Sequence, residues 1–166
     1  MAAVGTLVSF SIQNTSKRNT MTTGLDVFDA TVQHTNLWLK DLMARVSTTD
    51  RHYAYQLLRS TLHVFRDRIG PENAVHLGAQ LPMLIRGFYY EGWQLNKVPT
   101  KTRHLDDFLN AIEEEAGRDL GSELESKVKA VFAVIADKID AHEIEKLRKV
   151  LPAELQPLLS EEFYLF

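Results

Sequence analysis

The 166-residue chain contains no cysteine, which excludes a disulfide framework, a thiolate metal site and a cysteine nucleophile. It also lacks any uninterrupted apolar run near the ~18 residues that a transmembrane helix requires, so we expect no membrane association. Residues 1–20 lack the basic start and long apolar core of a secretory signal. These absences together predict a cytoplasmic protein.

The chain has no excess of positive charge either, its formal net charge being −3. Residues 26–95 carry seven basic and seven acidic side chains, and residues 96–166 carry ten basic and fifteen acidic ones. A nucleic-acid-binding domain usually carries a basic face or stripe. We therefore expect no nucleic-acid partner.

No segment alternates apolar and polar residues in the manner of a strand, and no Asn-Gly or Asp-Gly hairpin dipeptide occurs. Apolar residues instead recur at helical spacing. Leu58, Leu62, Phe65 and Ile69 follow one another at intervals of four, three and four, which is typical of a buried helical stripe. The sequence predicts an all-α fold.

Capping and helix-breaking residues divide the chain into eight expected helices. In the first half they are helices over 26–46 and 50–69, the latter capped from Ser47-Thr48-Thr49, and two opened by Pro71 and Pro82. In the second half they are a helix over 103–116, one capped by Ser122 with Glu125, one capped by Asp140 with Glu143, and one opened by Pro152.

The two halves share a register. Shifting the sequence by 70 residues places Leu81-Pro82 on Leu151-Pro152, and residues 31–95 then show ten identities, six of them between positions 64 and 82. We interpret the fold as a helical bundle of two tandem pseudo-symmetric four-helix repeats forming one compact domain. Its expected parts are a flexible N-terminal tail over 1–23, repeat one over 24–95 and repeat two over 96–166.

Three stretches carry a family resemblance: residues 22–29 (TTGLDVFD), residues 79–93 (AQLPMLIRGFYYEGW), and the Leu58-Arg59, Leu62-His63 and Arg66-Asp67-Arg68 positions between them. Through them the chain resembles, over residues 22–165, the prokaryotic family known as domain of unknown function 2267. The resemblance implies a small all-helical protein with internal pseudo-symmetry. It implies no activity.

No arrangement of residues points to catalysis. The chain has no Gly-x-Ser-x-Gly elbow, no phosphate-binding glycine loop and no dinucleotide fingerprint. Glu113, Glu114 and Glu115 are consecutive and would point in different directions on a helix. The six histidines lack the spacing of zinc or di-iron motifs. We predict no catalytic residue, no metal and no cofactor.

The helix after Pro82 carries two apolar or aromatic stripes. The stripe expected to face the core comprises Leu81, Leu84, Ile85 and Phe88. The other, roughly 140° away, comprises Arg86, Tyr89, Tyr90 and Trp93. Arginine, tyrosine and tryptophan dominate interface hot spots, so our leading hypothesis is a non-enzymatic helical module that binds a protein partner or a second copy of itself. A helix sandwiched between two layers of the fold would explain the same pattern.

A basic stripe on the preceding helix supports an alternative function. Arg59, His63 and Arg66 share one side of that helix and, with Arg86, could line a positive cleft between helices two and four of the first half. Such a cleft would bind a small anionic ligand or cofactor. Alternatively, these side chains satisfy Asp67, Glu91 and the helix ends.

Overall fold

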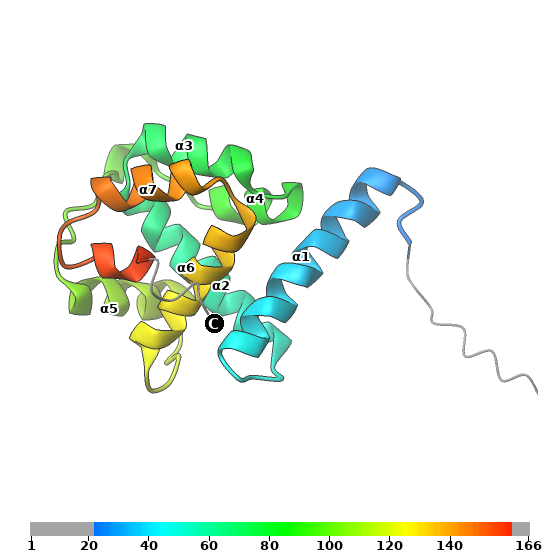
Figure 1. Ribbon diagram of the computed structural model, residues 1–166, viewed down its shortest axis with the longest axis horizontal. Coiled ribbons are helices and arrows are strands. Elements are labelled where there is room, and N and C mark those ends of the chain that lie inside the picture. The colour runs from blue at the N-terminus through cyan, green and yellow to red at the C-terminus, as the bar shows by residue number, and fades with distance from the viewer. Residues whose placement is uncertain (1–21, 161–166) are drawn as a thin grey trace, which may run out of the picture.

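A computed structural model describes residues 22–160, which are helical with no strand among them (Figure 1). The elements are α1 (Asp26–Arg45), α2 (Arg51–Arg68), α3 (Pro71–Gln80), α4 (Met83–Tyr90), η1 (Leu95–Lys97), α5 (Leu105–Ala116), α6 (Leu124–Lys138), α7 (Ala141–Val150) and η2 (Gln156–Leu159). The predicted all-α class is confirmed. The predicted tail, 1–23, lies outside the described residues except for its last two positions.

Helix α2 forms the centre of the molecule and contacts α1, α3, α4, α5 and α6. The predicted stripe of Leu58, Leu62, Phe65 and Ile69 is buried. Ser60, Thr61, His63 and Arg66 are buried as well, so α2 is enclosed around most of its circumference. A helix enclosed in this way must find hydrogen-bond partners for its polar side chains inside the fold.

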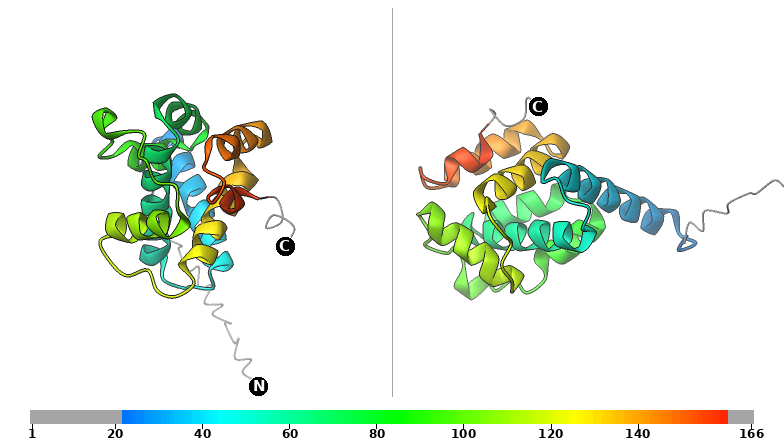
Figure 2. Two further views of the ribbon diagram at one scale, coloured as in Figure 1. Left: turned by 90° about the vertical axis from the view of Figure 1, so that its left-hand side faces the viewer. Right: turned by 90° about the horizontal axis from the view of Figure 1, so that it is seen from below.

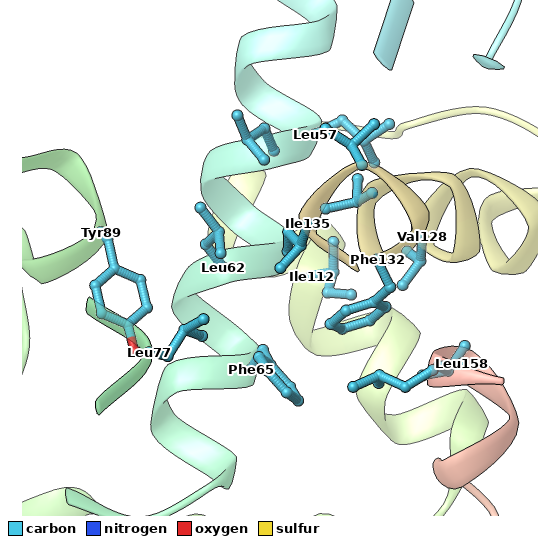
Figure 3. Packing of buried hydrophobic residues seen from close by; sticks show 14 of the residues in the cluster. Leu57, Leu62, Phe65, Leu77, Tyr89, Ile112, Val128, Phe132, Ile135 and Leu158 are labelled. Atoms are coloured by element: carbon cyan, nitrogen blue, oxygen red, sulfur yellow. The ribbon is translucent and has the colours of Figure 1, made fainter. Parts of the chain in front are cut away.

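Helix α6 is the second core helix and packs against α2. Its buried residues include Val128, Val131, Phe132 and Ile135. The rings of Phe65 and Phe132 meet edge to face with centroids 4.9 Å apart, a favourable arrangement for aromatic pairs (Figure 3). The contact between α2 and α6 therefore joins the two halves of the chain in a single core.

The first helix of each half packs on the second helix of the other half. Helix α1 lies against both α2 and α6, while α5 lies against α2. Trp38 and Leu42 of α1, and Phe108 and Ile112 of α5, supply the buried side chains of these contacts. The core is consequently shared between segments far apart in the sequence.

Two of the three predicted helix caps are wrong. Helix α2 is capped by Asp50, whose Oδ1 accepts from the Tyr53 N–H at 3.0 Å, while the Thr48 hydroxyl accepts from the Asp50 N–H. Helix α6 begins after Glu123, which has a left-handed backbone (φ 59°) and makes no side-chain cap, so the Ser122–Glu125 capping box does not form. The third is confirmed in part: Asp140 accepts from the backbone N–H groups of His142 and Glu143, but its own N–H donates to Oε1 of Gln80, so the reciprocal bond from Asp140 to Glu143 does not form.

The predicted fourth helix of the second half is also wrong. Pro152 opens a turn that leads only into the short 3₁₀ helix η2. The reason is Pro157, which takes the place that Gly87 has within α4 when the halves are aligned. Proline lacks an N–H and its ring clashes with the preceding turn, so an α-helix cannot continue through this position.

Candidate functional site

The eight residues of α4 are too few to form a stable helix in isolation, so its neighbours must fix it. At its start, the Leu84 N–H donates to the Thr31 hydroxyl of α1 at 2.9 Å. Thr31 is buried, and its carbonyl oxygen accepts from the Thr35 hydroxyl at 2.8 Å. These threonines hold the beginning of α4 against α1.

The end of α4 is held by two side chains of α2. Arg66 is only 3% exposed, and its Nη1 donates to the carbonyl oxygens of Tyr89 at 2.7 Å and Glu91 at 3.0 Å. Nε2 of His63 contacts the carbonyl oxygen of Phe88. The last carbonyls of a helix have no partner within it and attract positive charge. Arg66 and His63 therefore complete the C-terminal end of α4.

His63 also joins α4 to α5. Its Nδ1 lies 2.6 Å from Oε1 of Glu115. Its Nε2 faces the Phe88 carbonyl oxygen, which can only accept, so Nε2 is the donor of that hydrogen bond. Arg59 lies 3.3 Å from the carboxylate of Glu91 and 3.8 Å from that of Glu115. The predicted basic residues of α2 thus adjoin α4, and they contact groups of the protein itself.

Arg86 is exposed as a residue, yet its guanidinium closes the end of α3. Its Nε donates to the carbonyl oxygen of Gly78 at 2.8 Å, and its Nη2 donates to those of Ala79 at 3.2 Å and Leu81 at 2.9 Å. These are the unpaired carbonyls of the helix C-terminus. Arg86 therefore fixes the turn between α3 and α4.

The predicted aromatic residues lie at different depths. Tyr89 is fully buried, and its hydroxyl donates to the Ala74 carbonyl oxygen at 2.7 Å (Figure 3). Burial raises the pKa of Tyr89 far above its usual value. Tyr90 and Trp93 are half-buried, with ring centroids 5.5 Å apart. The stripe of Arg86, Tyr89, Tyr90 and Trp93 is thus divided between core and surface.

An apolar depression that the sequence pattern did not predict lies between α1 and α4. This α1–α4 groove of about 650 Å³ is lined by Phe28, Thr31, Val32, Met83, Leu84, Gly87, Phe88, Tyr90 and Glu91. Phe28, Met83 and Leu84 are 46%, 45% and 43% exposed. The sequence predicts Leu84 in the core stripe, but it is exposed; Leu81 and Ile85 of that stripe are buried, and so is Tyr89 of the other stripe.

The groove exists because α1 extends beyond the body of the protein. In its second half, Trp38, Leu39 and Leu42 are buried against other helices. Phe28 and Val32 continue the same apolar side towards the N-terminal end, where α1 projects away from the bundle (Figures 1 and 2). The signal in the sequence for this groove is the apolar side of α1, which continues at Phe28 and Val32 beyond the part of the helix that is buried in the core.

Two other kinds of site have no representative among residues 22–160. No three histidine, aspartate or glutamate side chains in this range lie close enough together to hold a metal ion. Within the same range, no helix combines the length and apolar character needed to cross a bilayer.

No curated protein matches the chain in sequence. Residues 35–158, which run from the middle of α1 to η2, match the family described as "Uncharacterized conserved protein (DUF2267)". This match spans well over half of the chain and confirms the resemblance noted from the sequence. By this sequence match, the chain belongs to the DUF2267 family of uncharacterized conserved proteins.

Proposed function

We propose that this protein is a helical interaction module that acts by binding another protein chain in the α1–α4 groove. We further propose that the groove receives the projecting half of α1 from a second copy. The observation that carries the proposal is the apolar side of α1, which continues past the core as Phe28 and Val32, beside the exposed Met83 and Leu84.

The size of the exposed surface supports binding. Leu25, Phe28, Val32, Met83 and Leu84 are between 41% and 52% exposed. Five large side chains in this state present roughly 400 Å² of apolar area, a size at which surface patches often mark interaction sites. Covering this area would remove it from water at a gain of about 25 cal/mol per Å².

A second copy suits the groove because the chain itself carries a complementary element beside it. The projecting half of α1 is an apolar helix end, and helices commonly bind in grooves between two other helices. A two-fold axis near Phe28 would place each α1 in the groove of the other copy, so every favourable contact would occur twice. Since a standard interface buries about 800 Å² per partner, the apolar patch would supply roughly half of it.

Leu84→Glu tests the proposal, because it places a charge in the groove without changing the core. We expect wild-type protein to sediment as a dimer at micromolar concentration and the variant to dissociate at least tenfold more readily. Leu95→Glu is the matched control, since Leu95 is 62% exposed in η1 and does not line the groove. Circular dichroism should show both variants folded. A wild-type monomer at all concentrations contradicts the second copy as occupant.

We also propose that the chain arose by duplication of the units 24–95 and 96–166. In support, α3 and α7 begin and end 70 residues apart, and Leu81 and Leu151 share nearly the same backbone angles, with ψ of 144° and 147°. Nδ1 of His76 lies 2.7 Å from Nζ of Lys146, its counterpart at the same interval. Contact between equivalent residues is expected beside a two-fold axis.

The anion-binding alternative between α2 and α4 remains a prediction. The contacts of Arg59, His63 and Arg66 with carboxylates and with the end of α4 favour a structural role for these side chains. A cytoplasmic location likewise remains a proposal, which the absence of cysteine supports.

A further inference from the structure

A polar pocket lies on another side of the molecule, where the end of α2 meets the start of α5 and the loop after α7. This Arg68–Arg103 pocket of about 530 Å³ is lined by Arg68, Arg103, His104, Val150, Leu151, Pro152, Ala153 and Glu154. The loop after α7 and the α5 region lie along the same edge of the bundle (Figures 1 and 2). The pocket shares none of its lining residues with the α1–α4 groove.

The two arginines bring like charges together. The Nε of Arg68 donates to the Thr102 carbonyl oxygen at 2.6 Å. Among residues 22–160, no carboxylate forms an ion pair with either Arg68 or Arg103. Burial, and after it the Arg103 guanidinium, lowers the pKa of Arg68. Within residues 22–160, Arg68 and Arg103 therefore line one pocket without a carboxylate paired to either guanidinium group.

The residue that corresponds to Arg68 in the other half does form an ion pair with a carboxylate. Lys138, at the end of α6, corresponds to Arg68 at the interval of 70, and its Nζ lies 3.1 Å from Oδ2 of Asp41 on α1. The counterpart of Asp41 on α5 is Ala111, which has no charge. Within residues 22–160, Arg68 thus has a carbonyl partner, Thr102, but no carboxylate partner like the one that Lys138 has in Asp41.

The pocket does contain one acidic side chain, which has other contacts. Oε2 of Glu154 accepts from the Leu105 N–H at 2.8 Å and lies 3.3 Å from Nδ1 of His104. The Glu154 carboxylate therefore caps the N-terminal end of α5, where the helix dipole favours a negative charge. The remaining wall includes the apolar Leu151 and Pro152, which can lie against an organic group.

We propose that the Arg68–Arg103 pocket binds a phosphate monoester of a small molecule. Guanidinium groups bind phosphate oxygens through pairs of N–H donors, and two of them can neutralise a phosphate dianion. The ligand's organic group would lie against Leu151 and Pro152. This proposal is independent of dimer formation through the α1–α4 groove.

Titration with inorganic phosphate, at constant ionic strength maintained with sodium chloride, tests the proposal by NMR chemical-shift changes or calorimetry. We expect saturable binding to the wild-type protein, weakened at least tenfold in Arg103→Gln. Lys101→Gln is the matched control, because it removes one positive charge from the same exposed segment and should change the affinity by less than twofold. Phenyl phosphate should bind more tightly than inorganic phosphate.

Thermal melts distinguish a binding site from a structural arginine. Without phosphate, Arg103→Gln should melt at the same temperature as the wild type or higher, because the substitution removes a repulsion. Phosphate should raise the melting temperature of the wild type and leave that of Arg103→Gln unchanged. A lower melting temperature of Arg103→Gln in phosphate-free buffer, no saturable binding by the wild type, or an equal loss of affinity in Lys101→Gln would each overturn the proposal.

Discussion

The α1–α4 groove and the Arg68–Arg103 pocket occupy related positions in the two halves of the chain and differ in chemistry. Both adjoin a Leu-Pro pair, Leu81-Pro82 in one half and Leu151-Pro152 in the other. Two residues after each proline, Leu84 lines the groove and Glu154 lines the pocket. Each Leu-Pro pair is thus followed by a surface residue that is apolar in one half and acidic in the other, and the backbone around it differs as well.

The length of the first helix produces much of this difference. Asp26, where α1 begins, corresponds to position 96, but α5 begins only at Leu105. The first half therefore has a projecting helix as one wall of its groove. The second half has a loop there, which carries Arg103 and is held to α2 through the Thr100 N–H and the Asp67 carbonyl oxygen at 2.8 Å.

The last element of each half is also held differently. His63 and Arg66 complete the end of α4, whereas their counterparts on α6 are Ala133 and Ala136. An alanine side chain cannot donate to a helix end. The half with the polar side chains has a full α-helix, and the half without them has a proline and a 3₁₀ turn.

The largest effect should come from removing the polar support of α4. Arg66→Ala leaves the carbonyl oxygens of Tyr89 and Glu91 without their donor in a buried environment, and we expect a loss of about 3 kcal/mol or more in the free energy of unfolding. Arg59→Ala removes only partly exposed ion pairs and should cost less than about 1 kcal/mol. Urea denaturation measures both; equal losses would show that Arg66 has no special part in holding α4.

A smaller effect should follow from the close approach of α3 and α4. A side chain at Gly78 would collide with the Tyr90 ring, so Gly78→Ala should cost about 1–3 kcal/mol through displacement of that ring. Gly87→Ala is the control within α4, where an added Cβ meets nothing, and it should gain about 0.5–1 kcal/mol from the lower helical propensity of glycine. Thermal or urea unfolding measures the change in the free energy of unfolding for both variants, which should be a loss for Gly78→Ala and a gain for Gly87→Ala. A stabilised Gly78→Ala variant would contradict the packing.

The smallest effect concerns the ion pair that distinguishes Lys138 from Arg68. Burial tends to raise the pKa of Asp41, but hydrogen bonds from Lys138 and Arg45 outweigh it and hold that pKa below its usual value. A carboxyl group whose pKa is lowered by folding stabilises the fold at pH values above its unfolded-state pKa, which is about 3.9 for aspartate. Asp41→Asn should therefore lower the free energy of unfolding by up to about 1 kcal/mol at pH 7.

This cost should shrink as the pH falls through the folded-state pKa of Asp41, since both proteins are then uncharged at position 41. Urea unfolding at a series of pH values measures the difference. Glu114→Gln, which removes an exposed carboxylate of α5, is the control and should show little change. A pH-independent difference between wild type and Asp41→Asn would rule out the ion pair as its source.

Most of the helical framework could be predicted because it depends on local signals. The buried stripe of α2 follows from helical spacing, Pro71 and Pro82 precede or open their helices, and Asp140 caps α7. The fourth helix predicted for the second half does not form, although Pro152 matches Pro82, because Pro157 falls inside it. One proline inside a helix outweighs an otherwise matching pattern.

The surface could not be predicted to the same extent, because exposure depends on which helices end beside one another. Spacing alone placed Leu84 in the core and Tyr89 on a binding face, but the position of α1 leaves Leu84 exposed and buries Tyr89. Arg66 donates to the adjacent Asp67, but the carbonyl oxygens that Arg66 and His63 contact at the end of α4 lie more than twenty residues away in the sequence. Such long-range contacts leave no local pattern in the chain.

The crossed packing of the first helices bears on how the chain folds. Since α5 covers α2 and α1 covers α6, neither half can acquire its complete hydrophobic shell before the other is present. Nucleation within one half would gain little until the loop between α4 and α5 closes and brings the distant helices together. We therefore expect a single cooperative transition with no stable half-folded species, and expect a chain cut between α4 and α5 to fold only when both fragments are mixed.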